Sequence, residues 1–365
     1  MLPVVPKLRL LRFLYARPLH AALALTALLA VLPGAAFAQP FGAWFTLNGA
    51  PTHGFVQVPH SLALNPTNAL TIEAWISVTT APSPENCRSI IGKNWLQSYW
   101  LGVCSGALRS YLRGGTTPRN GGLIPSNQWT HVAVVFTGTE RRHYINGELI
   151  VSFPEAAPLP TSTDPVRIGS DVSWQFTPQG AIDEVRLWNV ARTTAQLRST
   201  INVALTTPQP GLVAVWSLDG NGNNTLGPHD GSVMGAGTGF LTFPVALNCG
   251  SNTATSLCLL DRFTVRARFR TGAPGTAEGT AQTVPFANDG SGLFWFFSPD
   301  NWEIMVKALN ACGLNDRFWV FSAATTNVFY RMEVTDVRGA QKIFFNYPGP
   351  PAPAVTDTGA FATCP

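Results

Sequence analysis

Apolar and polar residues alternate with a period of two along much of the chain beyond residue 40. The longest such segment is Leu70–Val78, where four apolar side chains fall on one face while Glu73 and Trp75 share the other. Alternation of this kind predicts a β-strand with one face in a core. Shorter apolar segments of the same type recur between Gly, Pro and Asn residues, which is typical of antiparallel β structure.

Residues 181–189 show a different pattern, with apolar side chains on both faces of the expected strand. A strand of this kind is predicted to be central in its sheet and covered on both sides. Asp183, Glu184 and Arg186 interrupt the apolar positions. Because buried charges need partners, we expect these three side chains to be paired within the protein.

Two local signals predict a turn and a helix. Asn146-Gly147 separates two alternating segments, and this dipeptide is typical of a two-residue hairpin turn because it tolerates positive φ angles. Thr193 and Gln196 have the spacing of a capping box, and apolar residues then recur one turn apart. This pattern predicts a short helix that packs against the sheet.

Further strands are expected in the first part of the chain, and residues 219–239 are interpreted as loop and closure. The predicted strands are residues 55–58, 88–93, 98–103, 129–136, 166–168 and 212–218.

Five segments in this part carry a family resemblance. They are residues 70–76, 128–133, 144–147, 167–169 and 180–189. With these landmarks in this order, residues 39–239 resemble a laminin G-like domain of the concanavalin A-like jelly-roll type. The resemblance implies two antiparallel sheets packed face to face, and it implies no single activity.

A second β module is expected after a linker. Residues 240–257 are rich in Gly, Ser, Thr and Asn, as linkers are. Residues 258–365 resemble a C-terminal module of secreted bacterial proteins with no assigned activity, and we expect a smaller β-sandwich there. Its predicted strands are residues 262–270, 292–297, 302–309, 317–322, 328–336 and 341–346. The predicted fold is therefore all-β, a jelly-roll sandwich followed by a smaller sandwich.

The first 38 residues have the layout of a secretory signal peptide. Four basic residues precede an apolar run at residues 21–32, and Ala36 and Ala38 provide the small residues that a signal peptidase reads. We therefore predict cleavage after Ala38 and release into the periplasm or the medium. The alternatives are an uncleaved membrane anchor and an Arg-rich transit peptide, although the apolar run is shorter than the ~20 residues that a span needs.

The net charge of the chain without this segment gives no support for two classes of partner. The chain has 24 Lys and Arg against 20 Asp and Glu, and the predicted leader contains four of the basic residues and none of the acidic ones. The mature chain is then neutral, so its charge gives no reason to expect binding to nucleic acid or to an acidic membrane.

Six cysteines suit an oxidising compartment. The register of the hairpin formed by residues 88–93 and 98–103 places Cys87 opposite Cys104, close enough for a disulfide. The remaining four cysteines allow three pairings, of which we favour Cys249 with Cys258 and Cys312 with Cys364. No Cys-x-x-Cys pair occurs, so a structural role is expected for all six.

Two tryptophans are the candidate ligand-binding residues. Trp95 and Trp174 fall in predicted loops, where an indole could stack on the apolar face of a sugar ring. The alternative is that each indole covers a hairpin or the edge of a sheet.

A catalytic site is the competing interpretation. Laminarinase-type glycoside hydrolases share this general fold and use two carboxylates, which Glu73 and Glu184 could supply from neighbouring strands. The closely spaced acidic motif of those enzymes is absent, so a buried ion pair with Arg186 is favoured. His131 lies in a strand that is apolar on both faces and is expected to be a packed residue.

The resemblance also implies a structural calcium ion. Many concanavalin A-like sandwiches hold one Ca²⁺, and the positions here that resemble its ligands are Asn48 and Asp183. Their oxygen atoms suit Ca²⁺, although relatives often have Asp in place of Asn48. Alternatively, Asp183 accepts hydrogen bonds from loop amides or pairs with an arginine.

These observations together predict a secreted, non-catalytic recognition or adhesion protein that binds carbohydrate or an extracellular protein. The alternatives are a glycan-cleaving hydrolase on the same fold and a structural surface component.

Overall fold

The computed structural model describes residues 43–45, 54–78, 87–112, 118–172, 180–235, 238–240, 248–285, 288–349 and 352–364. The predicted leader, Asn48 and Trp174 lie outside these residues. The described part is almost entirely β structure, and it contains no helix that is long and apolar enough to cross a membrane.

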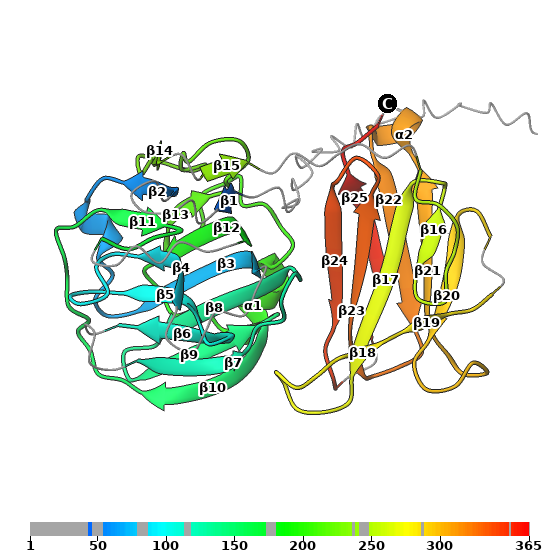
Figure 1. Ribbon diagram of the computed structural model, residues 1–365, viewed down its shortest axis with the longest axis horizontal. Helices are drawn as coiled ribbons and strands as arrows, with labels where there is room; N and C mark the ends of the chain where they lie inside the picture. The colour runs from blue at the N-terminus through cyan, green and yellow to red at the C-terminus, as the bar shows by residue number, and fades with distance from the viewer. Residues whose placement is uncertain are drawn as a thin grey trace, which may run out of the picture. The chain divides into compact units, whose positions relative to one another are not determined.

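The first domain is built from two antiparallel sheets (Figure 1). Sheet A has the order β10-β9-β8-β3-β12-β1-β15, with β13 also paired to β12. Its strands are β10 (Glu148–Pro154), β9 (Glu140–Ile145), β8 (Thr130–Phe136), β3 (Leu70–Val78), β12 (Gly180–Trp188), β1 (Ala43–Phe45), β15 (Thr238–Phe240) and β13 (Leu212–Trp216).

Sheet B has the order β14-β2-β11-β4-β5-β6-β7. Its strands are β14 (Ser232–Met234), β2 (Phe55–Val58), β11 (Val166–Ile168), β4 (Cys87–Gly92), β5 (Trp100–Cys104), β6 (Ala107–Tyr111) and β7 (Arg119–Leu123). A short 3-10 helix, η1 (Leu62–Leu64), follows β2.

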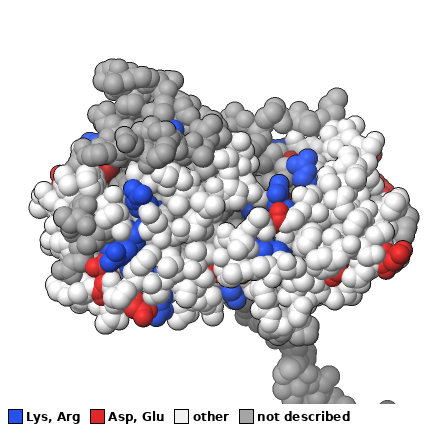
Figure 2. Space-filling view, turned by 60° about the horizontal axis from the view of Figure 1, so that its bottom comes forward, with Lys and Arg blue, Asp and Glu red and all other residues white. Residues whose placement is uncertain are grey.

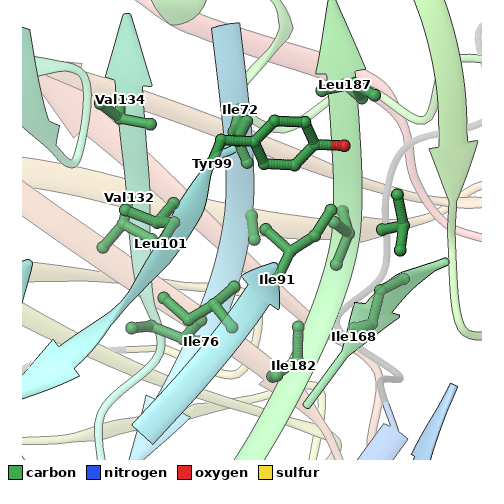
Figure 3. Close-up of a cluster of buried hydrophobic side chains, with 14 of the residues drawn as sticks. Ile72, Ile76, Ile91, Tyr99, Leu101, Val132, Val134, Ile168, Ile182 and Leu187 are labelled. Carbon is green, nitrogen blue, oxygen red and sulfur yellow. The ribbon is translucent and has the colours of Figure 1, made fainter. Parts of the chain in front are cut away.

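The inward faces of the two sheets form one hydrophobic core (Figure 3). Ile72 and Ile76 from sheet A and Ile91 and Leu101 from sheet B belong to it, and each is at most 1% exposed. Burial of an aliphatic side chain of this size contributes roughly 1.5–3 kcal/mol, so this alternating set holds the sandwich together. The jelly-roll prediction is confirmed.

The local predictions around β12 are also confirmed. All nine residues of β12 are buried, and β12 pairs with β3 on one side and with β1 and β13 on the other. The hairpin turn has positive φ angles at Asn146 (49°) and Gly147 (73°), as the dipeptide predicts. Helix α1 (Thr194–Thr200) begins with a complete capping box between Thr193 and Gln196.

Five strands of this domain were not expected from the pattern, and the first of them, β1, precedes all the predicted strands. β6 and β7 extend the edge of sheet B, and β7 has the sequence RNGGL, which shows no apolar alternation. β14 and β15 lie within or just beyond the segment predicted as loop and closure. β14 and β15 pair with β2 and β1, which are distant in sequence, and local periodicity does not reveal such pairing. β6 and β7 instead continue sheet B from β5 through consecutive antiparallel pairs.

The C-terminal module contains two five-stranded sheets, as expected for a small β-sandwich. One has the order β16-β17-β23-β24, with β18 paired to β17, and the other has the order β19-β20-β21-β22-β25. The strands are β16 (Leu257–Leu259), β17 (Phe263–Arg270), β18 (Gly279–Thr280), β19 (Gln282–Thr283), β20 (Ser291–Trp295), β21 (Trp302–Asn310), β22 (Phe318–Ala324), β23 (Phe329–Asp336), β24 (Gln341–Asn346) and β25 (Val355–Phe361).

The six predicted strands of this module correspond to β17 and β20–β24. Strand β25 and the short strands β16, β18 and β19 were missed. A second core rich in Phe, Val and Ala lies between the two sheets.

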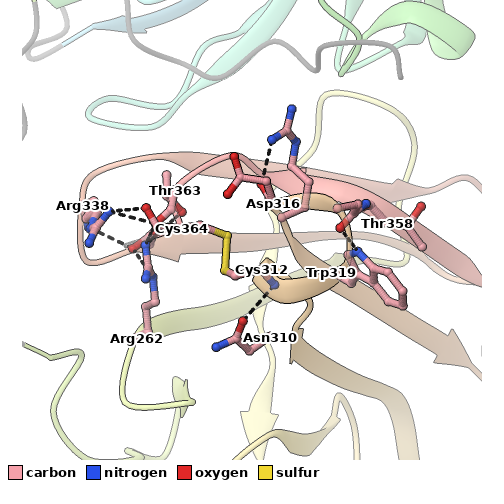
Figure 4. Close-up of a disulfide and its surroundings, with 12 residues drawn as sticks. Arg262, Asn310, Cys312, Asp316, Trp319, Arg338, Thr358, Thr363 and Cys364 are labelled. Carbon is pink, nitrogen blue, oxygen red and sulfur yellow. Dashed lines mark hydrogen bonds and ion pairs between the residues drawn. A yellow bond between two sulfur atoms is a disulfide. The ribbon is translucent and has the colours of Figure 1, made fainter. Parts of the chain in front are cut away.

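All six cysteines form disulfides, in the pairs favoured from the sequence: Cys87–Cys104, Cys249–Cys258 and Cys312–Cys364. The last pair joins the start of helix α2 (Cys312–Asn315) to the segment after β25 (Figure 4). Arg338 donates to the carbonyl oxygens of Thr363 (2.9 Å) and Cys364 (3.0 Å), so the same segment is also held by hydrogen bonds.

Candidate functional site: an aromatic row on sheet B

The outward face of sheet B carries a line of residues that register places side by side. Each residue lies opposite the next on the neighbouring strand, so their side chains share a face. From β14 to β6 the line is Ser232, Gln57, Arg167, Gly92, Trp100 and Tyr111. We call this line, together with Trp95 and Asp171, which pack onto it, the aromatic row.

Two glycines make room for the indole of Trp100. A Cβ atom at Gly102 would lie 2.3 Å from the Trp100 ring, and one at Gly92 would lie 2.7 Å from it and 2.4 Å from an Asp171 carboxylate oxygen. The Trp100 ring and the Asp171 carboxylate therefore pack directly on the backbone of these glycines, where any side chain would clash. The Trp100 Nε1–H also donates to Ser89 Oγ at 2.7 Å, and the side chain is 2% exposed, so this ring is a fixed support.

The predicted binding residue Trp95 lies beside this support. Its ring meets Tyr111 edge to face at 5.2 Å, and Tyr111 meets Trp100 in the same way at 5.6 Å. The Trp95 backbone N–H points at the carboxylate of Asp171, at 3.2 Å to the nearer oxygen. Trp95 and Tyr111 are both half-buried, so each ring has a packed side and an accessible side.

Arg167 adds a guanidinium group to the row. It donates from Nε to Gln57 Oε1 at 3.1 Å and from Nη1 to the backbone oxygen of Asp171 at 3.2 Å, and it lies 4.5 Å over the ring of Phe55. Partial burial lowers the pKa of Arg167, and the carboxylates of Asp171 and Asp164 oppose this effect. An arginine pKa stays far above neutral pH, so the group remains a cation with a fixed direction.

The row combines two aromatic side chains with fixed donors and acceptors. Across the face of the molecule drawn in Figure 2, Lys, Arg, Asp and Glu form small groups among residues of other types. Aromatic faces bind apolar CH surfaces, while amide and guanidinium groups bind oxygens. The arrangement therefore suits a ligand that presents both kinds of surface.

Glu73, one of the two possible catalytic carboxylates, is fully buried on the opposite side of sheet A from the sandwich core. Its Oε1 accepts from Trp188 Nε1 (2.8 Å) and Arg192 Nη1 (2.6 Å), and its Oε2 lies 3.3 Å from His131 Nε2. Burial alone would raise the pKa of Glu73, but the His131 hydrogen bond and the guanidinium groups of Arg186 and Arg192 outweigh it and lower the pKa to about 2.

Glu184, the other candidate, is buried and paired with Arg186 at 2.7 Å. Arg186 also donates to the backbone oxygens of Thr200 (2.9 Å) and Val203 (2.7 Å), which ties β12 to the end of α1. The sequence suggested Arg186 as the partner of Glu73, and the two do lie opposite each other in register. The observed ion pairs differ from the expected Glu73–Arg186 pair. Arg192 pairs with Glu73, and Glu184, at a bulge in β12, pairs with Arg186.

His131 is buried, as expected for a packed residue, although it also contacts the Glu73 carboxylate. Burial lowers the pKa of His131, and the hydrogen bond with Glu73 opposes that effect. The imidazole therefore completes the hydrogen bonding of a buried carboxylate and does not face solvent.

Asp183, the predicted calcium ligand, is buried in β12. Its Oδ1 accepts from the Glu184 backbone N–H at 2.9 Å, and its Oδ2 is buried without a hydrogen-bond partner. Burial, followed by the charges of Glu184 and Asp219, raises the pKa of Asp183 well above its usual value. An unsatisfied carboxylate oxygen fits a cation ligand. In the described part of the chain, however, no three His, Cys, Asp or Glu side chains are arranged to hold a metal ion.

Sequence reasoning missed most of the row. Trp100, Tyr111, Arg167 and Asp171 were read as parts of strands or of their connections. One signal was present in the sequence. Leu101 and Val103 point into the core, so Gly102 between them faces outward, and a glycine in a strand often marks a place where a neighbouring side chain lies close to the backbone.

Residues 49–198 match the family described as the concanavalin A-like lectin/glucanases superfamily. This match covers less than half of the chain, and it identifies the first domain as a concanavalin A-like domain. No curated protein matches the chain.

Among solved structures, a candidate carbohydrate-binding protein from Bacteroides ovatus is 21% identical, with a TM-score of 0.45, over 57% of this chain and 62% of that one. The chain thus spans less than two thirds of that protein. A SAP-like pentraxin from Limulus polyphemus is 19% identical over 43% of this chain and 79% of that one, with a TM-score of 0.33. The CBM40 module of a Ruminococcus gnavus sialidase, bound to α2,3-sialyllactose, is 15% identical over 40% and 91%, with a TM-score of 0.33.

Proposed function

We propose that the first domain is a non-catalytic carbohydrate-recognition domain and that the aromatic row is its binding surface. The observation that supports this proposal is the row itself, in which the half-buried Tyr111 packs between the half-buried Trp95 and the fixed indole of Trp100, on the same sheet face as Arg167 and Gln57. A sugar ring has apolar CH faces and a rim of hydroxyl groups, which match the rings and the polar groups respectively.

The row favours carbohydrate over an extracellular protein as the ligand. Protein interfaces of standard size bury about 800 Å² on each partner around a desolvated apolar centre. Here the accessible rings are few and lie among polar side chains that are already oriented by hydrogen bonds. Orientation before binding lowers the entropic cost for a small polar ligand.

Two burial facts support the absence of catalysis. Glycoside hydrolysis needs an acid and a second carboxylate that both reach the scissile bond. Glu73 and Glu184 are each buried and held in ion pairs, with exposed fractions of 0% and 3%. On the row, Asp171 is fully buried beneath its neighbours and holds the Trp95 backbone.

The binding proposal is tested on a glycan array with purified protein. Trp95→Ala and Arg167→Ala should each weaken binding to the strongest glycan at least tenfold, which corresponds to about 1.4 kcal/mol. Trp302→Ala is the matched control, because Trp302 is an exposed tryptophan of the C-terminal module and lies outside the row. Unchanged binding in both row variants would refute the assignment of the site.

The catalytic alternative is tested separately. The protein is incubated with the glycans that it binds and with a polysaccharide panel, and released reducing ends are measured. Release that disappears in a folded Glu184→Gln variant would show that the domain is a hydrolase.

Secretion and a structural Ca²⁺ ion are part of the same proposal. The three disulfides are compatible with an oxidising compartment. The unpartnered Oδ2 of Asp183 supports the cation, which would bind there with Asn48 as the second predicted ligand and would neutralise the buried carboxylate.

A further inference from the structure

A cleft between loops of the first domain is lined by residues that do not belong to the aromatic row. This loop cleft has a volume of about 440 Å³ and is lined by His60, Leu62 and Asn65 from the segment after β2, by Gln97, and by residues 161–163. Its volume falls in the range of small-molecule sites, which is about 300–1,000 Å³.

The frame of the loop cleft is fixed by hydrogen bonds between its three loops. The Asn65 carboxamide donates to the backbone oxygen of Ser162 (3.0 Å) and accepts from its N–H (3.2 Å). Asp164 accepts from Asn94 Nδ2 and from Ser162 Oγ, both at 2.7 Å. The segments that carry the lining residues are therefore held in position before any ligand arrives.

The buried Lys93 orients the imidazole of His60. Lys93 Nζ donates to the backbone oxygen of Asp164 and lies 3.0 Å from His60 Nδ1. An ammonium group can only donate, so Nδ1 accepts, and the neutral imidazole carries its proton on Nε2. Because His60 is exposed, this N–H is a directed donor at the wall of the cleft.

The groups that line the cleft are polar and uncharged. The side chains of Gln97, Thr161 and Thr163 are exposed, and none of them makes a hydrogen bond to another described residue. The nearby charges of Asp164 and Lys93 are already engaged. Leu62 is 84% exposed and is the single apolar side chain of the lining.

From this arrangement we infer that the loop cleft is a second ligand site, which takes one neutral sugar unit. Amide, hydroxyl and imidazole groups match the hydroxyls of a pyranose, and Leu62 matches one apolar CH face. A charged sugar would lose hydration without finding a free counter-charge. The assignment stands on the cleft alone and does not depend on the aromatic row.

The test uses saturation-transfer NMR with the full chain and a panel of free sugars: glucose, galactose, mannose, xylose, arabinose and N-acetylglucosamine. Each monosaccharide is compared with a disaccharide that carries it at the non-reducing end, since such a terminal unit keeps all the hydroxyls of the free sugar except the anomeric one. Glucuronic acid is included as the charged probe. At least one neutral sugar should bind, and glucuronic acid should bind no more tightly than glucose.

Variants assign the binding to the cleft. Gln97→Ala and His60→Ala should each weaken it about threefold to tenfold, the effect of losing one hydrogen bond. Gln209→Ala is the matched control, because Gln209 is exposed and its side chain donates only to Thr207 among the described residues. All of these variants are measured in a Trp95→Ala background, because the aromatic row is itself proposed to bind sugars and its contribution to the signal has to be removed.

Three results would overturn the assignment. The first is the absence of binding by every neutral sugar at concentrations up to about 100 mM. The second is sugar binding in the Trp95→Ala background that neither Gln97→Ala nor His60→Ala weakens. The third is tighter binding of glucuronic acid than of glucose. Failure of the array experiment on the row variants would affect none of these outcomes.

Discussion

Replacement of Glu73 by Gln tests the view that the buried carboxylate is structural. The variant keeps the size of the side chain but removes the charge that faces Arg192 at 2.6 Å and His131 at 3.3 Å. Removing one partner of a buried ion pair costs about 3–5 kcal/mol, because the remaining charge stays buried. Arg192 also donates to the Gln196 backbone oxygen and to Thr200 Oγ1, so we expect a loss near 3 kcal/mol.

The acid dependence of stability gives an independent magnitude. The pKa of Glu73 is lowered from 4.5 to about 2 in the folded protein. A carboxyl group whose pKa is lower in the folded than in the unfolded protein stabilises the fold at pH values above the unfolded pKa. This contribution is lost as the pH falls from about 4.5 to about 2. At about 1.4 kcal/mol for each pH unit, the contribution is about 3 kcal/mol, which is of the same order as the cost of removing one partner of the ion pair.

The assay is urea unfolding of the wild type and Glu73→Gln between pH 7 and pH 2.5, with a thermal melt at pH 7. The free-energy difference between the two proteins should be about 3 kcal/mol at pH 7 and should shrink toward zero as the pH approaches 2. For a domain of this size the melting temperature should fall by about 6–12 °C.

Glu140→Gln is the matched control, since Glu140 forms an exposed ion pair with Arg142 and should change neither curve. Two results together would refute the structural role: a melting temperature of Glu73→Gln within 2 °C of the wild type, and the same loss of unfolding free energy below pH 4.5 in both proteins.

Three further predictions concern the fold and the metal. Gly102→Ala should destabilise the first domain by about 1–3 kcal/mol and change the tryptophan fluorescence, because the added methyl group meets the Arg88 backbone oxygen at 2.2 Å; an unaltered melt and emission spectrum would contradict this packing. Millimolar Ca²⁺ should raise the melting temperature of the wild type and not that of Asp183→Asn, with a gain of roughly 2.7 kcal/mol at a hundredfold excess over the dissociation constant; equal curves with calcium and with chelator would exclude the ion. Replacing Cys312 and Cys364 by Ser should cost about 2–5 kcal/mol in urea unfolding, and a variant as stable as the wild type would show that the disulfide is dispensable.

Much of the fold could be predicted from the sequence because its signals are local. Strand periodicity, the Asn146-Gly147 turn and the capping box at Thr193 depend on neighbours within a few residues, and all three are confirmed. The pairing of Cys87 with Cys104 followed from the register of a single hairpin. In each case a short segment contains the whole physical cause.

The candidate sites could not be read in the same way, because distant segments build them. Gln57, Arg167 and Trp100 become neighbours only through the order β2-β11-β4-β5 in sheet B, which the tertiary structure decides. The tertiary structure also decides which arginine pairs with Glu73. Arg186 lies opposite it in register, but Arg192, in the connection before α1, reaches the carboxylate. Sequence alone thus determined where strands and turns form, while the register between distant strands determined which side chains meet.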